Sequence, residues 1–216
     1  MAPKNKFTRE EMTDAALRVL QRGGIHAVTA QSIAQELGIS TRPIFTCFAT
    51  MEEVRKELHR ASEERYMKYV EAGMQSEIPF FGFGMQYLRF AKEEPELYRL
   101  LFLSAPAEGR EAAENGTMEE MKRSQESVRP YLMNIYHFDR PEADRYFRDL
   151  WLVVHSLATL IVTGSCPYDE REIGQILTGF SVSICKAIKE IPGFAEGNFE
   201  RNQVFYELTG TKKTKA

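Results

Sequence analysis

The sequence predicts an all-α protein, and three observations support this fold class. Apolar residues recur at three- and four-residue spacings over most of the 216 residues. Capping residues, glycines and prolines separate these stretches from one another. The strict alternation of apolar and polar residues that marks a half-buried strand is not found. We expect about nine helices, divided between an N-terminal three-helix domain over residues 1–65 and a C-terminal helical domain over residues 66–216.

The composition is that of a globular protein with a substantial core. Hydrophobic residues make up 43% of the chain and charged residues 27%, as in ordinary folded domains. The net charge is −3, but residues 1–60 hold 9 lysines and arginines against 7 aspartates and glutamates. The N-terminal part is therefore the basic one, although a solvated surface explains this mild asymmetry nearly as well as a nucleic-acid partner does.

The cysteines and the apolar stretches favour a cytoplasmic protein without a membrane segment. Cys47, Cys166 and Cys185 are odd in number and lack metal-ligand spacing, which favours a reducing compartment. No N-terminal targeting signal is recognised. The most apolar stretch, residues 150–162, is shorter than the roughly 20 residues that a membrane span needs.

The first helix is predicted over residues 7–23. Thr8 and Glu11 have the spacing of a capping box, and Gly23-Gly24 ends the helix. Its apolar stripe consists of Met12, Ala15, Ala16, Val19 and Leu20. This stripe supplies one side of a small N-terminal core.

Two short helices joined by a tight turn come next. Thr29 is placed to cap the first helix, and Gly38 supplies the left-handed residue that ends it. Ser40 is expected to cap the second helix, which buries Ile44 and Phe48 at positions i and i+4. The opposite face of the second helix carries Thr41, Arg42, Phe45 and Thr46.

Such a helix-turn-helix suits a DNA-binding role. The major groove of DNA admits one α-helix, and the exposed N-terminal side chains of that helix meet base edges and phosphates. Helix–glycine–helix corners also occur in many helical proteins that do not bind DNA. The pattern alone leaves both interpretations open.

A fourth helix is expected to begin at Thr50, with Glu53 completing a capping box, and to bridge to the second domain. Ile78-Pro79 marks the boundary, and residues 104–116 are interpreted as a mobile loop or frayed turn. Further helices are predicted over residues 80–94, 95–102, 118–135, 141–163 and 170–191. The tail beyond residue 196 is weakly patterned.

Several N-terminal motifs occur in a characteristic order. They are the helix MTDAALRVLQRGG, the Val28-Thr29 entry, Ile33-Ala34, Gly38-Ile39-Ser40, Ile44-Phe45, Phe48, and Glu52-Glu53 before Val54. In this order, ahead of an all-helical remainder, they resemble the DNA-binding domain of the TetR family of transcriptional regulators.

The later part of the chain resembles this family more loosely. YLRFAKEEPELYRLLF, residues 87–102, is similar to a stretch that many members carry in their fifth and sixth helices. Trp151 and His155 resemble the Trp-His-Gly signature of one C-terminal subfamily, with Ser156 in place of the glycine. The resemblance implies a homodimer formed through the last two long helices.

Three positions depart from the family pattern. Arg42 stands where a glycine is usual, Cys47 where a tyrosine or histidine is frequent, and Met51 where a lysine is common. That lysine and the aromatic residue typically contact phosphates in the family. The electrostatic contribution to DNA binding is therefore expected to be weaker here, with Arg42 compensating.

Arg42 is the principal candidate for DNA contact, because a guanidinium can bind guanine O6 and N7, or a phosphate, in a bidentate manner. The alternative is that Arg42 is a solvated surface arginine without a functional contact. The predicted DNA-binding residues are Thr29, Gln31, Ser40, Thr41, Arg42, Pro43, Phe45, Thr46 and Cys47. Phe45 is equally suited to the core, and Cys47 is either a redox sensor or, more simply, a small tolerated residue.

Aromatic residues and methionines are concentrated in the C-terminal domain, where they suit an apolar ligand pocket. The predicted ligand-binding residues are Phe81, Tyr87, Tyr98, Phe102, Met118, Met121, Trp151 and His155. Many of the apolar residues at helical spacing must belong to the core. Trp151 and His155 are at least as well explained as a packed core pair as they are as ligand contacts.

The function implied by the resemblance is that of a ligand-responsive repressor. It would bind double-stranded, palindromic operator DNA as a homodimer and be released by a small apolar or amphipathic effector. The four histidines and the glycines form no metal, nucleophile or phosphate-loop motif, so we predict no enzyme activity, no metal and no cofactor. The alternative, motivated by Met51, is a TetR-like sensor or adaptor that binds a protein partner.

Overall fold

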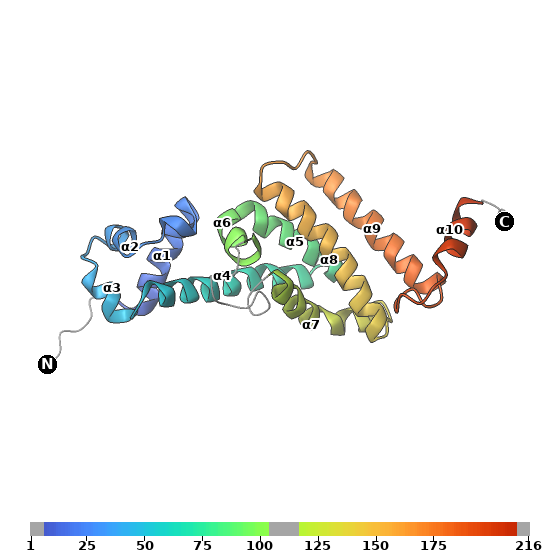
Figure 1. The fold of residues 1–216 in the computed structure, drawn as a ribbon, viewed down its shortest axis with the longest axis horizontal. Coiled ribbons are helices and arrows are strands. Elements are labelled where there is room, and N and C mark those ends of the chain that lie inside the picture. The colour runs from blue at the N-terminus through green and yellow to red at the C-terminus, as the bar shows by residue number, and fades with distance from the viewer. Residues whose placement is uncertain (1–6, 104–116, 211–216) are drawn as a thin grey trace.

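The computed structural model describes residues 7–103 and 117–210, and within these ranges the chain forms ten α-helices and no strand (Figure 1). The all-α prediction is confirmed. The helix beyond the expected nine is α10, Arg201–Thr209, in the weakly patterned tail. Residues 104–116, expected to form a loop, lie outside the described part of the chain.

Three helices form the N-terminal domain. α1 spans Arg9–Gly23, α2 spans Ala30–Leu37 and α3 spans Arg42–Cys47, with a short 3₁₀ turn at Ile25–Ala27. Side chains buried from these helices include Met12, Ala16, Leu20, Ile33, Ile44 and Phe48. The core therefore draws on the apolar stripes that the sequence predicted.

Capping of α2 follows the prediction, whereas capping of α3 does not. The Thr29 hydroxyl accepts a hydrogen bond from the backbone N–H of Ser32 at 3.1 Å, and Gly38 ends α2 with φ of 65°. The prediction that Ser40 caps α3 is wrong. Thr41 holds the cap position with φ −71° and ψ −19°, and no side chain bonds the first turn. Because Thr41 is already helical, the extended backbone that a side-chain cap needs is missing there.

Helix α4, Met51–Met74, belongs to both halves of the molecule. It packs on α1 near its beginning and on α5 near its end, and it bridges the two groups of helices (Figure 1). The boundary expected at residue 65 falls inside this continuous helix. A displacement of the end of α4 therefore reaches the N-terminal helices through a single rigid element.

The C-terminal helices are α5 Pro79–Glu93, α6 Pro95–Tyr98, α7 Thr117–Ile135, α8 Arg140–Val162, α9 Glu170–Glu190 and α10. α6 continues as a π-helical turn, Arg99–Leu103. α5 packs on both α4 and α8, and α8 also packs on α7 and α9. α9 and α10 lie at the end of the molecule opposite α3 (Figure 1). Within the described ranges, no helix is long and apolar enough to cross a membrane.

α4 and α5 meet backbone to backbone at Gly73. A Cβ atom built on Gly73 would lie 2.7 Å from the carbonyl oxygen of Gly82 and 2.7 Å from backbone atoms of Phe83. Side-chain atoms do not tolerate contacts this short with backbone. Although glycine inside a helix costs about 0.5–1 kcal/mol relative to alanine, only glycine permits this separation of the two helices.

Replacing Gly73 with alanine should push α5 away from α4 and lower the free energy of unfolding by about 1–3 kcal/mol, the usual cost of overpacking. Chemical denaturation measures the change. The control is Gly174→Ala in α9, where the added Cβ meets its nearest atom, Phe81 Cζ, at 3.9 Å. That variant should be as stable as the wild type or slightly more so. A Gly73→Ala protein of unchanged stability would contradict the backbone contact.

Candidate nucleic-acid interface and ligand pocket

Helix α3 has one buried and one exposed face. Ile44 and Phe48 are 0% and 1% exposed and belong to the core. On the other face Arg42 and Thr46 are exposed, and Phe45 keeps 49% of its surface accessible. Phe45 is thus exposed rather than part of the core. The outer face combines an arginine at the first helical position with a hydroxyl and an aromatic ring.

The other predicted contact residues lie in the turn and at the beginning of α2. Exposed residues of the predicted set are Thr29, Gln31, Ser40, Thr41, Arg42, Phe45 and Thr46, whereas Pro43 and Cys47 are half-buried. The Thr46 hydroxyl donates to the carbonyl oxygen of Arg42 at 3.1 Å, and that of Thr29 caps α2. Arg42 and Gln31 therefore carry the largest exposed hydrogen-bonding groups in the set.

Arg9 fixes the end of α3 to the beginning of α1, a contact that sequence reasoning missed. Its Nη1 donates to the carbonyl oxygen of Cys47 at 2.8 Å, and its guanidinium carbon lies 4.3 Å from the centroid of the Phe48 ring. A cation at a helix C-terminus also interacts favourably with the helix dipole. Arg9 thereby restrains how α3 presents its exposed face.

In the C-terminal domain, aromatic residues from α5, α6 and α8 surround one histidine. The hydroxyls of Tyr87 and Tyr98 each lie 3.0 Å from His155 Nδ1. The Trp151 indole stacks on the imidazole with ring centroids 4.7 Å apart, and Phe102 lies 5.2 Å from Tyr87. Burial lowers the pKa of His155, because a charged imidazole is poorly solvated there. The cluster is therefore polar but uncharged at neutral pH.

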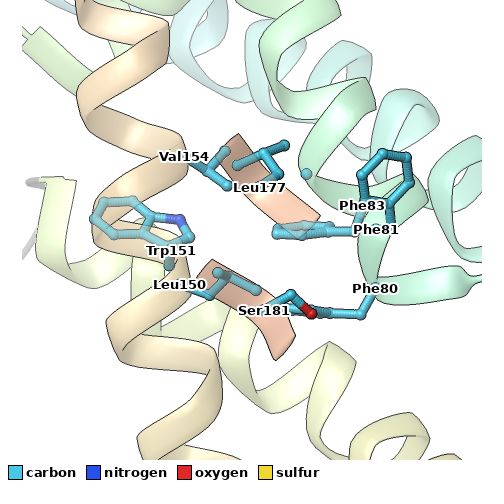
Figure 2. A pocket seen from close by; sticks show the side chains of 9 residues that line it. Phe80, Phe81, Phe83, Leu150, Trp151, Val154, Leu177 and Ser181 are labelled. Atoms are coloured by element: carbon cyan, nitrogen blue, oxygen red, sulfur yellow. The ribbon is translucent and has the colours of Figure 1, made fainter. Parts of the chain in front are cut away.

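A small pocket lies between α5, α8 and α9, next to this cluster (Figure 2). It is lined by Phe80, Phe81, Phe83, Gly84, Leu150, Trp151, Val154, Leu177 and Ser181. The free volume is about 10 Å³, close to what a single water molecule requires. The pocket is thus nearly closed in this conformation, and no charged side chain lines it.

Trp151 contributes an unused hydrogen-bond donor to this pocket. The side chain is 1% exposed, and its Nε1 has no hydrogen-bond partner among the described residues. Figure 2 shows this nitrogen on the side of the indole ring that faces the pocket. The Ser181 hydroxyl, 2.6 Å from the Tyr146 hydroxyl, is a second polar group there. An unsatisfied buried N–H costs about 1–3 kcal/mol, which an acceptor in the pocket would offset.

The predicted ligand-binding residues are only partly brought together. Tyr87, Tyr98, Phe102, Trp151 and His155 form the aromatic cluster, and Phe81 lines the pocket with Trp151. Met121 is buried in α7, whereas Met118 is 54% exposed. Sequence reasoning missed Leu177 and Ser181, because their helix was assigned wholly to dimerisation. The i, i+4 spacing of these two residues, which places both on one face, was the available signal.

Two protein-family models match the sequence. Residues 12–58 match the model described as bacterial regulatory proteins of the tetR family, and residues 80–178 match that of the tetracyclin repressor-like C-terminal domain. The matches follow the order of domains expected for one family and together span most of the chain. The chain belongs to the TetR family. No curated protein sequence matches it significantly.

Several solved structures have a similar fold. A TetR member from Streptomyces coelicolor A3 has 21% identity and a TM-score of 0.56, covering 82% of this chain and 98% of that one. A Rhodococcus sp. RHA1 protein of unknown function has 17% identity and a TM-score of 0.66, with coverages of 87% and 98%. The multidrug binding protein EbrR with malachite green has 22% identity and a TM-score of 0.55, with coverages of 80% and 96%.

The beginning of α4 carries one departure from the family pattern. Met51 is half-buried at the first position of α4 and packs on the core. Its apolar side chain therefore does not provide the phosphate contact that a lysine at this position would make. Assignment to the Trp-His-Gly subfamily stays a prediction. In the part of the chain that the structure describes, no group of His, Cys, Asp and Glu is arranged to hold a metal ion.

The His155 imidazole should titrate with a midpoint below 6.5, the value of an ordinary histidine. Burial disfavours the charged ring, so the unfolded chain binds the proton more tightly than the folded protein does. The free energy of unfolding should therefore decrease as the pH falls below about 6.5. The Cε1–H chemical shift, assigned by its absence in His155→Gln, measures the midpoint by NMR. A midpoint at or above 6.5 would show that the imidazole is solvated or paired with a charge.

Proposed function

We propose that the chain is a homodimeric transcriptional repressor that binds near-palindromic operator DNA and dissociates when a small apolar or amphipathic molecule enters the C-terminal domain. The observation that carries this proposal is the exposed face of α3 with Arg42 at its N-terminal end, opposite the buried Ile44 and Phe48. A helix docked in the major groove meets base edges with its N-terminal residues. The proposal divides the chain into a DNA-binding domain, residues 1–65, and an effector-binding and dimerisation domain, residues 66–216.

The dimer is proposed to form through α8 and α9. Both helices expose large apolar side chains, namely Leu152, Leu160, Phe180 and Val182 at 36–59% exposure. A patch of this kind is typical of a protein interface. These helices lie at the opposite end of the molecule from α3 (Figure 1). A two-fold axis there would leave both copies of α3 free to meet half-sites one DNA turn, about 34–36 Å, apart.

The release signal is proposed to pass through α6. Tyr98 of this helix contacts His155 of α8. Immediately before α6, the Glu94 carboxylate accepts a hydrogen bond from Gln21 Nε2 of α1 at 2.8 Å and pairs with Arg65 of α4. A movement of α8 that shifts α6 would therefore reach α4 and also α1, whose Arg9 holds the end of α3. A coupling of only ~1–3 kcal/mol is enough for a regulatory change.

The pocket chemistry suggests the kind of effector. Aromatic rings line the pocket, charged groups do not, and Trp151 Nε1 offers an unpaired donor. A flat, uncharged molecule with one hydrogen-bond acceptor fits this chemistry. Since the free volume in this conformation is about 10 Å³, room for roughly one water molecule, such an effector must favour a more open conformation. Differential affinity for two conformations is what a ligand needs in order to act as a switch.

Replacing Arg42 with alanine should weaken specific operator binding by roughly 1–3 kcal/mol, because one bidentate contact to a base is lost. Fluorescence anisotropy with an operator selected on the purified protein measures this at several salt concentrations. Arg60→Ala is the control, because Arg60 is an exposed arginine of α4 held by Glu57 and Glu64, and it should bind as the wild type does. Unchanged affinity and sequence preference in Arg42→Ala would remove this residue from the interface.

The alternative function is a TetR-like sensor or adaptor that binds a protein partner, and Met51 is the observation that favours it. Phosphate contacts dominate DNA affinity and make it fall steeply with salt. A wild-type protein that selects no DNA sequence, or whose binding barely responds to salt, would support the adaptor and contradict the repressor.

Trp151→Phe should reduce the affinity for 2-acetylnaphthalene about 2- to 10-fold, the effect of losing one hydrogen bond worth roughly 0.5–1.5 kcal/mol. The affinity for 2-ethylnaphthalene, which has a similar shape but no acceptor, should change much less. Titration calorimetry on both proteins gives the four affinities. An equal loss for the two compounds would show that ring shape, rather than the indole N–H, determines binding.

A further inference from the structure

A cluster of charged side chains joins the middle of α4 to α7, away from the pocket. It consists of His59 and Glu63 of α4 with Glu120 and Arg123 of α7. Arg123 Nη1 lies 2.9 Å from Glu120 Oε1 and also pairs with Glu63 Oε1. His59 Nδ1 lies 3.4 Å from the same Glu63 oxygen. We call these four residues the α4–α7 charge cluster.

The two carboxyl groups of the cluster have opposite environments. Glu120 is 5% exposed, and its burial, together with the adjacent Glu63, raises its pKa to about 7. The pKa of Glu63 is lowered to about 2, mainly by a hydrogen bond from His59. Hydrogen bonds from Glu120 and Arg123 contribute to the same shift. His59 contacts Glu63 alone, whereas the Arg123 guanidinium contacts both carboxyl groups, so an ionised Glu120 must share its contacting cation with Glu63.

Among the described residues, the other ionisable groups near the cluster place no further cation against Glu120. Tyr66 of α4 and Tyr87 of α5 are buried and their pKa values are raised, so they stay neutral. Glu119 of α7 lies near Arg123 and pairs with Lys122 at 3.7 Å. Among the described residues, the charge of the cluster is therefore set by Glu63, Glu120, His59 and Arg123 together.

We propose that Glu63 and Glu120, which share the Arg123 guanidinium, also share one proton, and that this proton strengthens the link between α4 and α7 and makes the position of α3 responsive to pH. With the proton bound, the Glu120 carboxyl group donates to the Glu63 carboxylate, and Arg123 balances the single negative charge. Without it, two carboxylates repel each other across the helix contact. The connection to α3 rests on the proposed DNA-binding function, whereas the proton site does not.

The direction of the effect follows from proton linkage. When α4 and α7 separate, Glu120 meets water and returns to its ordinary pKa of 4.5. The linked state thus binds the proton more tightly, and the stabilisation it provides is present at low pH and lost as pH rises through about 7. Glu63 acts in the opposite direction only at more acidic pH. His155 opposes the effect in part of the same range, so variants must be compared rather than the wild type alone.

Carbon-13 NMR of labelled glutamate side chains detects the proton site directly. One carboxyl carbon of the wild type should titrate with a midpoint near 7. The signal should be absent in Glu120→Gln, present in the control Glu119→Gln, and shifted to lower pH in Glu63→Gln, which lacks the opposing carboxylate. If every glutamate of the wild type titrates near 4.5, the proposal is overturned, and this result does not require any variant to fold.

Unfolding equilibria test the energetic link. Between pH 8 and pH 6, the unfolding equilibrium constant of the wild type relative to Glu120→Gln should fall about tenfold, as linkage gives for a group whose pKa moves from 4.5 to about 7. The ratio of wild type to Glu119→Gln should stay constant. A constant ratio for Glu120→Gln as well would contradict the proposal.

Operator binding tests the connection to α3. Wild-type affinity should change between pH 6 and pH 8, and this change should be lost in Glu120→Gln and kept in Glu119→Gln. Equal pH dependence in all three proteins would overturn the connection to α3. If none of them binds operator DNA at either pH, the proposed repressor function fails, while the carboxyl titration still decides whether the proton site exists.

Discussion

The backbone contact of α4 with α5 at Gly73 is the constraint on which the rest of the structure depends. It holds one end of α4 in the C-terminal domain, while the beginning of α4 follows α3 in the chain and packs on α1. Changes in the C-terminal domain can reach the N-terminal helices along α4, or through Glu94, immediately before α6, which bonds to Gln21 of α1 and Arg65 of α4. The fold thereby leaves few routes between its two domains.

Most of the fold was predictable because its signals are local. Capping residues and apolar stripes located the helices of the N-terminal domain and the long helices α4, α5, α8 and α9 to within a few residues. The cap of α3 was not predictable, since the dihedral angles of Thr41 depend on how the turn after Gly38 packs. α10 was also missed, because none of its residues is buried among the described parts of the chain and no apolar stripe marks it.

The candidate sites were less predictable because their contacts join distant residues. The exposure of Arg42 followed from helical spacing alone, but the support of α3 by Arg9 spans 38 positions. Residue type and spacing singled out Tyr87, Tyr98 and His155. They did not predict that both tyrosine hydroxyls contact the same imidazole nitrogen. Nothing in the sequence singles out Glu63 and Glu120. Only the meeting of α4 with α7 makes them a pair.

Helix α9 contributes residues both to the pocket and to the proposed dimer interface. Leu177 and Ser181 line the pocket on one side, while the neighbouring Phe180 and Val182 face outward, toward the proposed partner subunit. In such a dimer, only the thickness of α9 separates an effector bound in the pocket of one subunit from the partner subunit. A change in the packing of α9 around a bound molecule would therefore reach the proposed interface directly.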